Sequence, residues 1–282
     1  MYEQHPCHRS GRLGQSILNM PEKLFTDPIV LQGDMLFVSD AHLCTPPDDA
    51  SRQREESLIQ LLKQHKNHLK HLFLLGDIFD FWFEYRDVVP KGYFRLFNLF
   101  YELHHNGVEI YYFTGNHDMW VLNYLTEELG VHVFNRQQAF VLNGKRCLVG
   151  HGDGLGGKQR RYRFIKWLFG LKSNYVLYSM LHPRQAFSIA RHISASSRAA
   201  HKPEGLQFQK EAEFQIQYAR QVMQQEQVDC FIYAHRHVPI EYKLDDNTYF
   251  FNSGDWIIHF SYITFWKESQ TPVLERFIVQ NK

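Results

Sequence analysis

Cysteine is scarce in this sequence: four occur in 282 residues, and none forms a Cys-x-x-Cys pair. Two of them, Cys147 and Cys230, sit within apolar runs that predict strands. This spacing argues against a disulfide framework and against a structural zinc site. It fits a reducing cytosolic compartment.

Long hydrophobic runs are also missing. No stretch approaches the roughly 18 consecutive apolar residues of a membrane-spanning helix, and residues 1–34 contain no apolar core of the signal-peptide type. The sequence shows no internal repeats, and its formal net charge of +1 points to no particular partner. We therefore expect a cytoplasmic protein, which can still lie against a membrane surface.

Apolar, β-rich runs recur from residue 35 onward and alternate with helix-like segments at 51–64, 92–106 and 119–130. This alternation predicts a layered α/β fold. The last three runs follow one another closely, which suggests a meander on a second sheet. The predicted strands cover residues 35–39, 71–75, 108–114, 145–150, 229–234, 248–252, 261–266 and 273–279.

Two segments depart from this alternation. Residues 1–33 are polar and lack periodicity, so we expect a poorly ordered extension before one domain of residues 34–282. An insertion at about 154–227 predicts several short helices and a longer one at 211–227. Its first part, residues 154–203, contains ten Lys or Arg and no Asp or Glu. Since the whole chain carries +1, the remaining residues together carry −9.

Aromatic residues lie between the cations of this insertion, and three interpretations remain open. Ordinary helices can pack an apolar face on the core and send their lysines outward. Basic and aromatic residues together can also bind nucleic acid through phosphates and stacked bases. A third possibility is a lid that faces lipid, because such helices lie well on an anionic membrane. Composition alone does not separate the last two.

Polar residues gather where the predicted strands end. In α/β sheets, ligands bind beyond the carboxyl ends of strands, so these ends should converge. Each motif alone is an ordinary turn or cap, but their conjunction points to a metal site. The motifs are Ser-Asp-Ala-His at 39–42, Gly-Asp-Ile-Phe-Asp at 76–80, Gly-Asn-His-Asp at 115–118, Gly-His-Gly-Asp at 150–153 and Ala-His-Arg-His at 234–237.

These residue types suit a pair of cations. Two ions held close together need a bridging carboxylate, and Asp77 is the natural candidate. Carboxylate oxygens combined with imidazole nitrogens suit Mn²⁺, Fe²⁺ or Zn²⁺, whereas Ca²⁺ prefers oxygen alone. Two ions about 3.5–4 Å apart activate water and neutralise charge during an in-line displacement at phosphorus.

The ordered set of motifs resembles the calcineurin-like metallophosphoesterase superfamily, from Met35 to about Trp256. The resemblance implies a four-layer α/β/β/α sandwich of two mixed sheets with a helical lid insertion. It also implies two divalent metal ions, for which we expect Mn²⁺. One ion would be held by Asp40, His42, Asp77 and His237, and the other by Asp77, Asn116, His151 and His235.

The same resemblance implies a catalytic role for His117, which would contact the phosphate and protonate the leaving oxygen. Asp118 would orient its ring. Hydrolysis would proceed without a covalent enzyme intermediate.

A narrower resemblance is to the UDP-2,3-diacylglucosamine diphosphatases of lipid A synthesis, through residues 39–44, 76–82, 151–153 and the basic insertion. It implies a nucleotide-lipid substrate, cleaved to UMP and 2,3-diacylglucosamine 1-phosphate at the inner face of the cytoplasmic membrane. Two motifs differ: many members carry Arg in place of His117, and Gly-His-Thr-His in place of residues 234–237. The implied substrate contacts are Asn116, His117, Tyr162, Ser197 and His235.

Two alternatives accompany this expectation. One is another metallophosphoesterase that acts on nucleotides or nucleic acid, although we expect no nucleic-acid substrate and infer no protein partner. The other is a metallophosphoesterase-like scaffold without catalysis. Such scaffolds usually lack some metal ligands, whereas all seven are present here.

Overall fold

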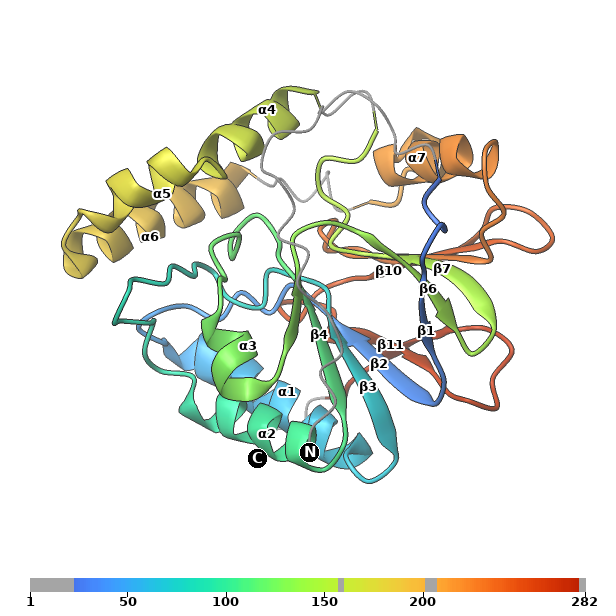
Figure 1. The fold of residues 1–282 in the computed structure, drawn as a ribbon, viewed down its shortest axis with the longest axis horizontal. Helices are drawn as coiled ribbons and strands as arrows, with labels where there is room; N and C mark the ends of the chain where they lie inside the picture. The colour runs from blue at the N-terminus through green and yellow to red at the C-terminus, as the bar shows by residue number, and fades with distance from the viewer. Residues whose placement is uncertain (1–22, 157–159, 201–206, 279–282) are drawn as a thin grey trace.

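A computed structural model describes residues 23–156, 160–200 and 207–278 of the chain (Figure 1). Two six-stranded mixed sheets form its centre. The first sheet has the order β1 (Ile29–Leu31), β6 (Gln138–Leu142), β7 (Lys145–Val149), β8 (Cys230–Tyr233), β10 (Tyr249–Ser253) and β9 (Pro239–Lys243). The second has the order β12 (Val273–Arg276), β11 (Ser261–Phe265), β2 (Asp34–Val38), β3 (Leu69–Leu74), β4 (Glu109–Phe113) and β5 (His132–Phe134).

The two sheets pack face to face around an aromatic core. Phe73 of β3 stacks on Phe37 of β2, with ring centroids 4.4 Å apart. It also meets Phe140 of β6, in the other sheet, edge-on at 5.4 Å. Alternate residues of β2 face the helices instead, so both faces of the strand are buried. This explains its continuous apolar run, which is typical of parallel strands.

Helices cover the outer face of each sheet. α1 (Asp49–His65), α2 (Phe94–His105) and α3 (Tyr124–Leu129) lie on the second sheet, and α7 (Phe214–Met223) lies on the first (Figure 1). α1 begins where Asp48 accepts a hydrogen bond from the backbone N of Ser51 at 2.7 Å, a typical N-cap. The expected four-layer α/β/β/α sandwich is therefore confirmed.

Three further helices lie between β7 and α7 in the sequence and extend beyond the sandwich (Figure 1): α4 (Arg160–Phe169), α5 (Lys172–Ser179) and α6 (Pro183–Ala200). We call them the lid helices. Tyr175 of α5 stacks on Phe83, with ring centroids 5.0 Å apart, and its hydroxyl donates to the carbonyl of Glu84 at 2.7 Å. A short 3-10 helix, η3 (Lys210–Ala212), precedes α7. None of the described helices is long and apolar enough to cross a membrane.

Two expectations need correction. The polar extension was expected to end at residue 33, but Ile29–Leu31 form β1, which pairs in parallel with β6. Residues 1–22 lie outside the described part of the chain. The expected meander of the last three strands is also wrong, because β10 lies in the first sheet whereas β11 and β12 lie in the second.

Candidate metal centre

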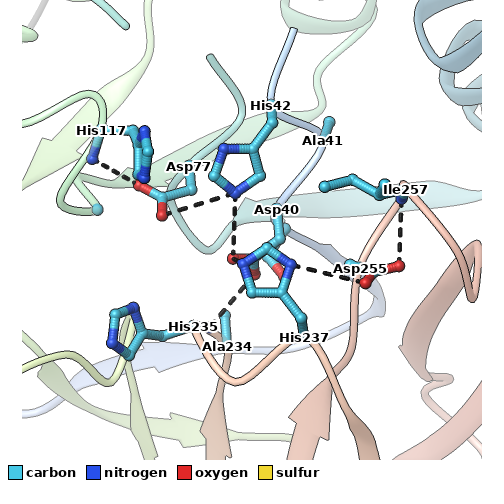
Figure 2. A network of polar contacts seen from close by, with 12 residues as sticks. Asp40, Ala41, His42, Asp77, His117, Ala234, His235, His237, Asp255 and Ile257 are labelled. Atoms are coloured by element: carbon cyan, nitrogen blue, oxygen red, sulfur yellow. Dashed lines mark hydrogen bonds and ion pairs between the residues drawn. The ribbon is translucent and has the colours of Figure 1, made fainter. Parts of the chain in front are cut away.

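The five motifs converge beyond the strand ends, as their positions predicted. Three groups of side chains place one ligand atom each within 4.8 Å of one another. Figure 2 shows residues of these groups from the loops after β2, β3, β4 and β8. The groups are Asp40, His42 and His237; Asp77, His151 and His235; and His42, Asp80 and His117.

Asp77 lies between two of these groups. Its Oδ2 is 3.4 Å from Nε2 of His151 and 3.9 Å from Nε2 of His42. Nε2 of His42 is in turn 3.8 Å from Oδ1 of Asp40, which is 3.4 Å from Nε2 of His237. Oδ1 of Asn116 lies 3.4 Å from Nε2 of His151. All seven expected ligands therefore lie in one region, with one carboxylate near both histidine groups.

Five of these residues have left-handed backbone conformations. Such a conformation costs a side-chain-bearing residue on the order of 1–3 kcal/mol, and it clusters at functional sites. Contacts between the loops compensate: the N–H of His42 donates to the carbonyl of Asp77 at 3.0 Å, and that of His235 to Oδ2 of Asp40 at 3.2 Å. The φ angles are 49° at Asp40, 42° at His42, 52° at Asp77, 71° at His235 and 55° at His237.

Hydrogen bonds and carboxylates fix the histidine rings from behind. Nδ1 of His151 is 2.7 Å from the carbonyl oxygen of Leu75, so Nδ1 directs a proton at that oxygen and Nε2 is the nitrogen that faces Asp77. Nδ1 of His42 is 3.5 Å from Oδ1 of Asp80. A carboxylate behind a histidine in this way is typical of metal ligands.

Nδ1 of His237 has a similar partner, lying 3.6 Å from Oδ2 of Asp255 (Figure 2). Neither Asp255 nor Asp80 was expected to support a metal ligand. Asp80 closes the motif that follows β3, and Asp255 lies two residues beyond the end of β10. This placement is the signal that would have identified them.

His117 lies beside Asp77 but is oriented differently from what we expected. Its backbone N–H donates to Oδ1 of Asp77 at 2.8 Å, and its Nδ1 is 3.0 Å from the carbonyl oxygen of Asp80. The carboxylate of Asp118 accepts hydrogen bonds from the backbone N–H of Gly115 at 2.7 Å and from that of Ile78 at 3.0 Å. It therefore joins two loops, and Asp80 provides the contact on the His117 ring.

Burial and the neighbouring carboxylates act in opposite directions on the histidines of the centre. Burial alone would lower the pKa of His42 and of His151, but the surrounding carboxylates raise both to about 10. The pKa of Asp77 is well below its usual value, because His151, His117 and His42 outweigh the effect of burial. Burial, assisted by His151, lowers the pKa of His235 to about 3, so this imidazole is neutral.

These residues fit divalent cations. Oδ1 of Asp40 and Nε2 of His42 are buried without a hydrogen-bond partner among the described residues. Such atoms are costly unless something pairs with them, and a cation would do so. Carboxylate, amide and imidazole donors together match Mn²⁺, Fe²⁺ or Zn²⁺.

Two expected substrate contacts lie on the lid helices. The hydroxyl of Tyr162 donates to Oδ2 of Asp153 at 2.8 Å, and its ring lies 6.1 Å from that of His235. Nζ of Lys166 is 2.6 Å from the same carboxylate oxygen and lowers the pKa of Asp153 to about 2, although burial alone would raise it. Ser197 falls within α6, but its side chain lies outside the described part of the structure.

Comparisons with known proteins identify the family to which this chain is similar. The calcineurin-like phosphoesterase family matches residues 34–239. A UDP-2,3-diacylglucosamine hydrolase of Porphyromonas gingivalis is 34% identical over 258 residues, which covers 87% of this chain and 98% of that protein. One from Aliivibrio fischeri is 25% identical and covers 79% of this chain and 90% of its own. Among solved structures, a phosphoesterase from E. coli has a TM-score of 0.39 at 15% identity, over 87% of this chain and 100% of that one.

Proposed function

The chain belongs to the calcineurin-like phosphoesterase family and is a hydrolase, and we propose that it uses two divalent cations to hydrolyse UDP-2,3-diacylglucosamine. The products would be UMP and 2,3-diacylglucosamine 1-phosphate. The observation that carries the metal chemistry is the position of Asp77 between two histidine groups. The substrate is supported by the Porphyromonas gingivalis relative, which matches along almost its whole length.

Seven side chains would hold the cations, for which Mn²⁺ suits the mixed oxygen and nitrogen donors. When bound, the two ions supply an activated water and neutralise charge on the attacking and leaving oxygens at phosphorus. Asp40, His42, Asp77 and His237 would hold one ion, and Asp77, Asn116, His151 and His235 the other.

The remaining residues of the centre would bind and orient the diphosphate. His117 would contact the phosphate and pass a proton from Nε2 to the leaving oxygen. The carbonyl oxygen of Asp80 supports this role, because its contact with Nδ1, together with the backbone contact to Asp77, fixes the orientation of the ring. Asn116 and His235 would contact the same phosphate. Water is the nucleophile, and no bond to the protein forms.

The lid helices would supply the binding energy for the acyl chains and a contact with the membrane. Exposed apolar side chains lie along α4 and α5, among them Trp167, Leu168 and Leu177. Exposed cations, including Lys172, Arg184 and Arg191, accompany them. Each methylene buried against such a surface contributes about 0.8 kcal/mol. Tyr162 and Ser197 would contact the substrate near the centre.

A comparison of substrates tests this function. The metal-stripped protein, supplied with Mn²⁺, is assayed on UDP-2,3-diacylglucosamine, bis-p-nitrophenyl phosphate and single-stranded DNA. We expect rapid release of UMP from the first, slow hydrolysis of the second and none of the third. Faster cleavage of DNA than of the nucleotide-lipid would contradict the proposal and favour the nucleic-acid alternative.

A further inference from the structure

Gln215, the second residue of α7, is a buried amide directed at the metal centre from behind. Gln215 is 1% exposed, whereas the other side chains that α7 buries against the first sheet are mainly apolar, such as Ile216 and Ala219. A buried glutamine is costly unless its amide is fully hydrogen-bonded. Among the described residues, its side-chain hydrogen-bonding partners lie at the end of β10 or just beyond the ends of β7 and β8.

The amide nitrogen of Gln215 joins two of these loops. Nε2 donates to the carbonyl of Gly152 and to that of Ala234, each at 3.0 Å. Gly152 directly follows His151, and Ala234 directly precedes His235. One NH₂ group therefore contacts the backbone beside two of the histidines proposed to hold the same cation.

Asn252 completes the contact at the end of β10. Its Nδ2 donates to Oε1 of Gln215 at 3.0 Å and to the carbonyl of Ala234 at 2.7 Å. Its Oδ1 accepts from the N–H of Gly254 at 3.1 Å. The two amides form a closed network in which each donor meets an acceptor.

The backbone leaves room for this network. Gly152 has a φ of 92°, and a Cβ atom at this position would collide with Nε2 of Gln215. The N–H of Ala234 also donates to the carbonyl of His151 at 3.0 Å. The His151 and His235 loops are thus in contact, and Gln215 ties both to α7.

We propose that Gln215 is a positioning residue, which sets the spacing of His151 and His235 and thereby the affinity for the cation they would share with Asp77 and Asn116. The inference rests on the proposed two-metal function. The other cation depends less on Gln215, because its histidines have separate supports. His237 faces Asp255, and its ring stacks on that of His42 with centroids 5.1 Å apart.

The chemistry of the side chain suggests the variants. Gln215→Glu keeps the shape but replaces the NH₂ donor with a carboxylate oxygen, which repels the two carbonyls. Gln215→Met keeps the length of the side chain but has neither the amide oxygen nor the amide nitrogen. It replaces Gln215→Glu in the experiment if that variant does not fold. Gln217→Glu is the matched control, because the side-chain amide of this glutamine, on the same helix, donates to the carbonyls of Glu211 and Ala212 and, among the described residues, does not contact the loops of the metal centre.

Calorimetric titration of the metal-stripped proteins with Mn²⁺ provides the measurement. We expect two ions per wild-type chain. In the Gln215 variants, one of the two should bind about tenfold or more weakly, the usual effect of removing the support behind a metal ligand. The other ion should bind to the Gln215 variants with wild-type affinity. The Gln217→Glu control should bind both ions with wild-type affinity. The melting temperature of each stripped protein is recorded alongside.

The outcomes separate this inference from the function on which it rests. Fewer than two ions on the wild-type chain would refute the two-metal function itself. Two ions of unchanged affinity in the Gln215 variants would refute only the positioning role. A lower melting temperature with unchanged affinities would make Gln215 a purely structural residue, and equal weakening of both ions would also overturn the proposal.

Discussion

At the scale of single residues, Asp77 is the side chain that connects the two groups of histidines into one candidate metal centre. It is 1% exposed, its Oδ1 accepts from the backbone of His117, and its Oδ2 approaches His42 and His151. A carboxylate can bridge two cations through two oxygens, whereas an amide offers one oxygen and no charge. Asp77 therefore provides the sharpest single-residue test.

Replacement of Asp77 by Asn should remove both the charge and the bridge. We expect the purified variant to retain less than one ion per chain and to lose on the order of a hundredfold or more in kcat, because both ions would participate in the proposed displacement. Metal content by elemental analysis and UMP release measure the two effects. Asp246→Asn is the control, since this carboxylate is 98% exposed on the turn between β9 and β10. Two ions retained by Asp77→Asn would exclude the bridge.

Tyr112 tests the role that the structure gives to Asp118. Its hydroxyl donates to Oδ2 of Asp118, and both residues are fully buried. Tyr112→Phe leaves the shape intact but removes a donor to a carboxyl group, so the free energy of unfolding should fall by about 1.5–3 kcal/mol. Urea denaturation measures this loss. Tyr101→Phe, at a half-exposed position on α2, is the control and should change the free energy of unfolding by less than about 0.5 kcal/mol. Equal effects would argue against a structural role for Asp118.

The ligand set could be predicted from the sequence because each ligand belongs to a short motif at a strand end. The contacts behind the ligands could not. Whether Asp80 or Asp118 reaches the ring of His117 depends on how two loops pack, and both carboxylates occur in plausible motifs. Gln215 lies about 60 residues from Gly152 and shares no motif with it, so only the fold brings the two together.

At the scale of elements, the apolar runs predicted most strands, but they did not predict the sheet to which each belongs. β10 and β11 have similar buried patterns, yet they enter different sheets. Strands buried on both faces carry no alternation that would distinguish one sheet from the other. β1 escaped prediction because three residues at a sheet edge are too short to show a period.

β1 makes a testable contribution to stability. Ile29 and Leu31 pack against the core between the sheets, and Phe25 lies under the guanidinium of Arg146 at 4.1 Å. A chain that starts at Asp34 loses these contacts, worth about 2 kcal/mol or more, whereas one that starts at Lys23 keeps them. We expect a melting temperature lower by about 4 °C or more for the shorter chain. Equal melting temperatures by calorimetry would show that β1 contributes nothing to stability.

The lid helices should determine the preference for acylated substrate. Trp167 and Phe169 are exposed on α4. Replacing both with Ser removes apolar surface from the lid helices and leaves the proposed metal ligands unchanged. The ratio of kcat/KM for UDP-2,3-diacylglucosamine over UDP-N-acetylglucosamine should then fall by about tenfold or more, since each lost methylene contact is worth about 0.8 kcal/mol. The rate on bis-p-nitrophenyl phosphate should stay unchanged.

Phe94→Ser is the control for the lid variant, because it also replaces an exposed aromatic side chain with serine, but on α2 and away from the lid helices. If the intact protein cleaved the acylated and the non-acylated nucleotide sugars with equal kcat/KM, the lipid substrate would be wrong. The metal chemistry would be unaffected by that result.

At the scale of the whole molecule, a net charge of +1 conceals a strong asymmetry. Ten cations and no acid fall within residues 154–203, and the other residues together carry −9. A field of this kind favours anionic substrates and anionic surfaces, and salt screens it within about 8 Å at physiological ionic strength. The lid helices thus combine positive charge with an apolar surface, and both suit a diphosphate that carries acyl chains.

The central claim is that this family member is a two-metal hydrolase of UDP-2,3-diacylglucosamine. It is tested most directly by following UMP release while the EDTA-stripped protein is titrated with Mn²⁺. We predict no release without metal and full recovery once two ions are bound per chain, because the Asp77 carboxylate, which lies near both His42 and His151, would serve both proposed ions. Full activity in the stripped protein, or recovery complete at one ion per chain, would contradict the account.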